Sequence, residues 1–239
     1  MIAGVAPRAL PRLTGGTTPS FDKAMTNFTH APGTMMIHLA LDSLPDWAAG
    51  AELKTFAYVH LAPSLDQMAR TYAQAQAGIL PDEPAELYAA LEAAVPPKQT
   101  MAFVNYYKAG EVYPNEKPTV AVLLTAPADG KTYDINSPWV RSELDRISRV
   151  MGLDTPIDEL FEDHLVLTPE YFGEWGSALG ALYGKTHPLW QSGPFHNPQY
   201  RSIFRPWLRR VGASVHPGGG IPAVLGGTLI SLRDLKPTI

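Results

Sequence analysis

The residues best suited to chemistry lie in a glycine-rich stretch near the C-terminus, Gly212-Ala-Ser-Val-His-Pro-Gly-Gly-Gly-Ile-Pro222. Its three consecutive glycines follow a predicted strand (about 208–211) and let the backbone approach a ligand closely. Pro222 favours the first turn of a predicted helix, about 222–235, whose free amides and positive dipole end face the stretch. Such a turn suits a phosphate, a carboxylate or the electron-rich edge of a flavin. It can equally be only a tight strand–helix connection.

Other signatures of catalysis or metal binding are missing from the sequence. The seven histidines include no i, i+4 pair and no H-E-x-x-H, so no metal site is predicted. No G-x-S-x-G surrounds a serine, and the lack of cysteine removes disulfides, thiolate ligands and a cysteine nucleophile. The acidic clusters at 154–159 and 162–163 are predicted to lie at solvated helix starts. We therefore assign no catalytic residue.

Composition points to an ordinary globular protein. The chain has 239 residues, of which 45% are hydrophobic and 18% charged, with a net charge of −4. That charge gives no overall attraction to nucleic acid or to an anionic membrane, although Arg201, Arg205, Arg209 and Arg210 gather in one segment. No apolar run is long enough for a membrane-spanning helix, and the N-terminus lacks the basic segment of a signal peptide. We expect a cytoplasmic location.

Caps and prolines mark the predicted helices. Ser64 and Gln67 form a capping box, and Ser137 followed by Pro138 begins the clearest helix, which Gly152 ends. Apolar residues four, three and four apart give that helix a buried face of Val140, Leu144, Ile147 and Met151. The predicted helices are about 7–13, 64–77, 84–95, 138–151, short ones from Pro156 and Pro169, and 222–235.

Alternating apolar residues predict strands at about 35–41, 53–61, 100–107, 119–125 and 208–211. The middle of the chain therefore has the pattern of an antiparallel sheet with helices on one face. The two ends have the strand–turn–helix pattern of an α/β domain.

The stretch 212–222, followed by a helix of small residues, resembles the C-terminal signature of the phytoene desaturase family. This family comprises FAD-dependent oxidoreductases with an amine-oxidase-like fold that act in carotenoid biosynthesis. The resemblance extends over nearly the whole chain, through 32–42, 58–65, 167–170 and 189–195. It implies an α+β fold: an antiparallel-sheet substrate domain with flanking helices, plus the C-terminal strand, glycine turn and helix of an FAD-binding α/β domain.

The resemblance also implies domain limits and site residues. Residues 1–29 would be a remnant of the FAD-binding domain, 30–205 a substrate domain with a polyene tunnel, and 206–239 the closing part of the FAD domain. Trp190, Gln191 and Phe195 would line the tunnel, or alternatively pack in the core. His216 would lie beside the flavin or hold the turn by a hydrogen bond. The FAD-binding residues implied are Gly212, Ala213, His216, Pro217, Gly218, Gly219, Gly220, Ile221 and Pro222.

The implied activity is the dehydrogenation of a carotenoid, or another apolar polyene, by hydride transfer to FAD, with peripheral membrane contact to reach the substrate. A carotenoid ketolase is an alternative, because 34–81 is more similar to ketolases whereas 111–231 is more similar to desaturases.

The chain departs from the family in lacking the G-x-G-x-x-G fingerprint that binds the ADP part of FAD. We therefore expect the C-terminal half of a usual member, with an N-terminal-half partner chain or a homo-oligomer as partner. A non-catalytic half-chain, either a split-enzyme subunit or a lipid-binding remnant, is a further alternative.

Overall fold

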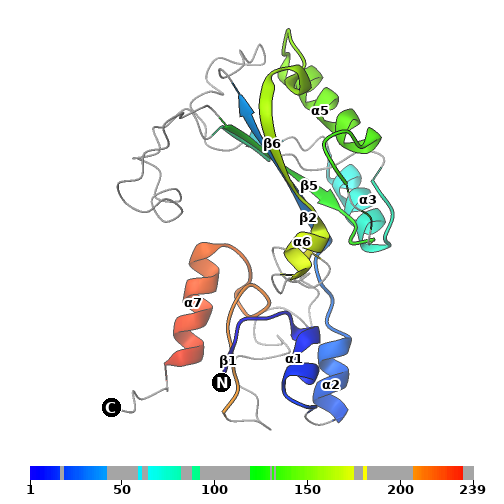
Figure 1. Ribbon diagram of the computed structural model, residues 1–239. Coiled ribbons are helices and arrows are strands. Elements are labelled where there is room, and N and C mark those ends of the chain that lie inside the picture. The colour runs from blue at the N-terminus through cyan, green and yellow to red at the C-terminus, as the bar shows by residue number, and fades with distance from the viewer. Residues whose placement is uncertain are drawn as a thin grey trace. The chain divides into compact units, whose positions relative to one another are not determined.

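The computed structural model describes part of the chain, and its residues divide into two compact units (Figure 1). One unit comes from Met1–Gly33 and Pro169–Ile239, and the other from Thr34–Thr168. The predicted domain limits, 1–29, 30–205 and 206–239, remain a prediction. The predicted strand 100–107 and most of 53–61 lie outside the described residues. Those residues are 1–16, 19–41, 59–60, 64–81, 88–91, 119–129, 131, 133–174, 180–181 and 207–233.

The second unit is built on a five-stranded sheet in the order β3-β4-β5-β2-β6. The pairs β2–β6, β3–β4 and β4–β5 are antiparallel. The strands at 35–41 and 119–125 are therefore confirmed, whereas β6 was not predicted. The strands are β2 (Gly33–Leu41), β3 (Val59–His60), β4 (Tyr88–Leu91), β5 (Thr119–Ala126) and β6 (Phe161–Leu167).

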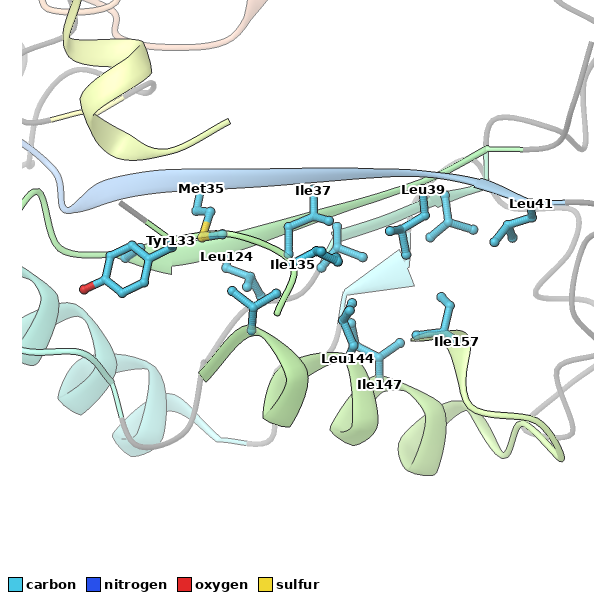
Figure 2. Packing of buried hydrophobic residues seen from close by; sticks show 14 of the residues in the cluster. Met35, Ile37, Leu39, Leu41, Leu124, Tyr133, Ile135, Leu144, Ile147 and Ile157 are labelled. Atoms are coloured by element: carbon cyan, nitrogen blue, oxygen red, sulfur yellow. The ribbon is translucent and has the colours of Figure 1, made fainter. Parts of the chain in front are cut away.

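Two helices, α3 (Leu65–Gln76) and α5 (Pro138–Met151), lie on one face of this sheet (Figure 1). Figure 2 shows the apolar residues of β2 and β5 pointing toward α5 and toward the 3-10 helix η4 (Ile157–Glu159). The four residues predicted for the inner face of α5 are all buried, which confirms that prediction. The buried cluster comprises Met35, Ile37, Leu39, Leu41, Val120, Val122, Leu124, Ala126, Tyr133, Ile135, Val140, Leu144, Ile147, Met151 and Ile157.

The helix ends follow the predicted caps, with one difference. The Ser64 hydroxyl accepts a hydrogen bond from Gln67 N at 3.2 Å, and Gly152 ends α5 with a φ of 65°. Ser137 occupies the N-cap position, but its hydroxyl accepts from Asp134 N at 2.9 Å and bonds no helix amide. The Ser137 hydroxyl, which we predicted to cap α5, therefore accepts a hydrogen bond from the preceding loop instead.

Two sequence predictions in this unit are wrong. Residues 88–91 of the predicted helix 84–95 form β4, because the hydrogen-bonding edge of β5 is available to them and tertiary pairing outweighs helix propensity. Glu162 and Asp163 were placed at a helix start but lie on the exposed strand β6. Asp158 does lie in a short helix, where its carboxylate accepts a hydrogen bond from Arg141 at 2.8 Å.

The first unit contains two parallel strands, β1 (Ile2–Ala3) and β7 (Arg209–Arg210), with Ile2 opposite Arg209. Leu208 is buried on one side of them in a cluster with Ala3, Leu10 and Met25. The helices α1 and α2 lie on that side, and α7 lies on the other (Figure 1). Helix α2 was not predicted. The helices are η1 (Pro7–Ala9), α1 (Leu10–Leu13), α2 (Pro19–Thr26), α6 (Pro169–Glu174) and α7 (Ile221–Leu232).

Core packing under α5 gives a first prediction. Replacing fully buried Leu144 with alanine leaves a cavity between α5 and the sheet, so we expect the free energy of unfolding to fall by about 2–5 kcal/mol. Val150 lies on the same helix with half of its surface exposed, and its replacement by alanine should change stability by less than about 0.5 kcal/mol. Urea unfolding followed by circular dichroism measures both. Equal losses would contradict the assignment of the buried face.

Candidate functional site

The glycine turn leaves β7 at the edge where both parallel strands end. Val211 N donates to Ala3 O at 3.1 Å, which brings the two strand ends together. A Cβ on Gly4 would lie 3.5 Å from Val211 Cγ2, and one on Gly212 would lie 4.0 Å from Gly4 O. Two glycines thus stand next to each other at the carboxyl ends of adjacent parallel strands. In open α/β sheets this is the edge where ligands bind.

Three glycines give the turn its shape because their backbones have positive φ. The values are 102° at Gly212, 130° at Gly218 and 87° at Gly220, a region that side chains with a Cβ rarely occupy. Val215 N donates to Gly212 O at 3.1 Å and closes the first part of the turn. Gly220 is the N-cap of α7, and its carbonyl accepts from Val224 N at 2.9 Å.

The turn rests on α7 at a glycine that the sequence analysis did not single out. A Cβ on Gly227 would lie 2.7 Å from the carbonyl oxygen of His216, so the turn and the helix touch only because no side chain intervenes. A Cβ on the neighbouring Gly226 would meet nothing within 4 Å. The available signal was a pair of glycines inside an otherwise apolar helix, where each one lowers helix propensity.

A buried arginine lies beneath the turn. Arg210 is 1% exposed, and its Nη2 donates to Ser214 O at 3.5 Å. Burial away from water lowers the pKa of Arg210 to about 9, so the guanidinium remains positively charged at pH 7. A fixed positive charge under a glycine turn favours electron-rich or anionic groups on the turn. Sequence reasoning noted only that arginines gather in this segment.

All of the predicted FAD-binding residues fall within this one turn and the start of α7. Pro217, Gly220 and Pro222 are exposed, and a Cβ on Gly220 would meet nothing within 4 Å. Within the described part of the chain, the N–H groups of Gly218, Gly219 and Gly220 donate no hydrogen bond. The residues predicted for the substrate tunnel, Trp190, Gln191 and Phe195, lie outside the described residues.

The second unit has an apolar sheet face turned away from α5. Met36, His38 and Ala40 of β2 are half-buried there, and the register places Leu167 opposite Met36 and Leu165 opposite His38. Leu165 is 55% exposed. Burial lowers the pKa of His38 from its ordinary value of 6.5, so the imidazole is neutral at pH 7. Around Met36 and Leu165 this face combines aliphatic surface with one neutral ring, and the register adds the exposed Asp163 opposite Ala40.

Among the described residues, no group of histidine and acidic side chains could hold a metal ion. No helix in the described ranges is both long enough and apolar enough to cross a membrane.

No family model matches this sequence. The chain is 32% identical over 119 residues to 1-hydroxycarotenoid 3,4-desaturase from Flavobacterium sp. (strain P99-3), and 37% identical over 116 residues to hydroxyneurosporene desaturase from Rubrivivax gelatinosus. The matches cover 48% and 45% of this chain and 24% and 21% of those two proteins. The matched region is thus a small part of each relative's length.

Both similar proteins are desaturases by name, one of them of a 1-hydroxycarotenoid. The resemblance to carotenoid desaturases is thus confirmed as sequence similarity over just under half of this chain.

The contact between the turn and α7 gives a second prediction. Gly227→Ala places a methyl group against the His216 carbonyl, so we expect a destabilisation of about 1–3 kcal/mol. Gly226→Ala meets open space and gains helix propensity, so it should stabilise by about 0.5–1 kcal/mol. Thermal unfolding of the two variants, followed by circular dichroism, gives the difference. Stabilisation by both alanines would show that the turn does not rest on α7.

His38 gives a third prediction, on pH. Because burial disfavours its imidazolium, the unfolded chain binds more protons than the folded protein between the lowered pKa and about 6.5. Stability contributed by His38 is therefore complete above about pH 6.5 and is lost as pH falls through that window. Urea unfolding from pH 7.5 to 5 should show this loss in the wild type and a smaller one in His38→Gln. His164, exposed on β6, is the control, and a larger effect from His164→Gln would refute the assignment.

Proposed function

We propose that this chain forms the C-terminal part of an FAD-dependent carotenoid desaturase. The observation that carries the proposal is the glycine turn at the carboxyl ends of β1 and β7, in a chain related to two carotenoid desaturases. That both relatives are desaturases favours dehydrogenation over ketolation. The substrate class proposed is a carotenoid or a similar apolar polyene.

The turn is suited to the isoalloxazine part of a flavin. A flat ring needs close backbone approach, and the turn offers glycines without Cβ atoms and three adjacent N–H groups free of acceptors in the described residues. Donors of this kind can bind the electron-rich edge of the ring, and the charge of Arg210 supports them from below. FAD, when bound, supplies the acceptor for the hydride that leaves the substrate.

The second unit's own contribution is apolar surface for the substrate. The apolar sheet face around Met36 and Leu165 is suited to an aliphatic chain. Because His38 is neutral, covering its ring with substrate costs less free energy than covering a charged side chain. We propose that this face contributes to the polyene site.

A partner half is the second element of the proposal. In the described residues, β1 and β7 pair only with each other, and α7 exposes Leu225, Leu229 and Ile230 by 51–64%. Ile2 and Trp207 add further exposed apolar surface in the same unit. Large exposed apolar surfaces in soluble proteins commonly mark interfaces. We propose that a dinucleotide-binding half, which holds the ADP part of FAD, covers them.

The same exposed surfaces favour one other candidate, a half-chain without catalytic activity of its own. It would act either as the subunit of a split enzyme or as a lipid-binding protein at a membrane surface. The two candidates differ in whether the chain retains FAD.

Flavin retention provides the fourth prediction. We expect the purified chain, mixed with FAD and passed through gel filtration, to keep flavin absorbance, either alone or with the dinucleotide-binding half of a matched desaturase. Gly218→Ala, which strains a backbone at φ 130°, should weaken retention at least tenfold. Gly78→Ala is the control, because it strains a φ of 78° in the other unit without touching the turn.

Retention that requires the added half would identify a split enzyme. A chain that retains no flavin in either arm would overturn the proposal and leave the lipid-binding candidate. Equal retention by the Gly218 and Gly78 variants would remove the turn from the flavin site.

A further inference from the structure

We propose that the interface between β7 and α7 is an oxyanion-binding site, in which the Arg209 guanidinium and the Ser231 hydroxyl bind one phosphate-type group. The proposal does not depend on the flavin, and it concerns the side of β7 opposite Arg210. It rests on two buried polar side chains that the described chain does not satisfy.

Arg209 is a largely buried arginine whose Nε lacks a hydrogen-bond partner. Its side chain is 7% exposed, and its Nε has no hydrogen-bond acceptor. Within the described residues its guanidinium forms no ion pair either, whereas the adjacent Arg210 reaches the carbonyl of Ser214. An uncompensated buried charge is costly, so proteins normally pair such groups with a counter-ion, a ligand or water.

The strand pairing places Arg209 on the side of β7 that faces α7. Side chains alternate along a strand, and Leu208 lies in the cluster on the α1 and α2 side. Arg209, opposite Ile2 in the register, therefore projects from the other side. Helix α7 lies on that side of the two strands (Figure 1).

Ser231 provides a second unsatisfied group on the facing helix. It is 2% exposed, and its Oγ has no hydrogen-bond partner. It lies one turn after Gly227, the residue that contacts the glycine turn, so both are on the buried side of α7. A guanidinium nitrogen and a hydroxyl without partners are thus buried on facing elements, and we infer that both donate to one acceptor.

The geometry of the donors at this interface favours a phosphate over a carboxylate. A tetrahedral phosphate presents acceptor oxygens outside any one plane, so it can accept from a planar guanidinium and from a hydroxyl on a facing element, whereas both oxygens of a carboxylate lie in one plane. The planar guanidinium fork matches phosphate oxygens in a bidentate manner. The ligand class is therefore inorganic phosphate or the phosphate group of a nucleotide.

The test uses Arg209→Met in the full chain, with melting temperature measured at constant ionic strength. In chloride alone we expect the variant to melt at a higher temperature than the wild type, because a buried charge without a partner has been removed. Millimolar phosphate or pyrophosphate should raise the melting temperature of the wild type. The apparent affinity of the variant for phosphate, derived from the same shifts, should be at least tenfold weaker. Acetate, the carboxylate arm, should have a smaller effect.

Arg149→Met is the matched control, because Arg149 is exposed on α5 and its loss should leave the phosphate response unchanged. Parallel titrations with ADP and with inorganic phosphate identify the source, and a response to either supports the site. The proposal is overturned if phosphate does not stabilise the wild type, or if Arg209→Met responds as the wild type does. It is also overturned if the variant is less stable than the wild type in chloride.

Discussion

The parallel pairing of β1 with β7 is the constraint on which the candidate site depends. Residues 2–3 and 209–210 are about two hundred positions apart in the chain, yet their hydrogen bonds bring the two strand ends to one edge. Parallel strands require a long connection, and here everything between the two short segments supplies it. The glycine turn has a defined position only because this pairing fixes where β7 ends.

The two units differ in the kinds of side chain that they bury. The second unit covers one sheet face with an aliphatic layer beneath α5, to which β2 and β5 contribute every second residue. The first unit buries two arginines on opposite sides of a two-residue strand and leaves apolar helix surface exposed. Such an arrangement is expected of a surface that binds something, since it has polar groups inside and apolar groups outside.

The sequence predicted most accurately where local chemistry determines structure. The cap at Ser64, the four-three-four spacing in α5 and the strand–glycine–helix order around residue 212 all depend on residues close together in the chain. The errors occurred where pairing between distant segments decides the secondary structure. Residues 88–91 favour a helix by propensity but form a strand that pairs with β5. The same holds for the site, because the turn was recognisable but the roles of Gly227 and Arg210 depend on tertiary contacts.

The two glycines inside α7 have a consequence for local opening of the structure. A twelve-residue helix with an adjacent glycine pair is too short and too weak in propensity to persist alone in water. It must form together with the turn that rests on Gly227, so the two behave as one cooperative segment. Any ligand that orders the turn would therefore also protect the amides of α7 against hydrogen exchange. Occupancy of the site and the folding of the last helix are one linked equilibrium.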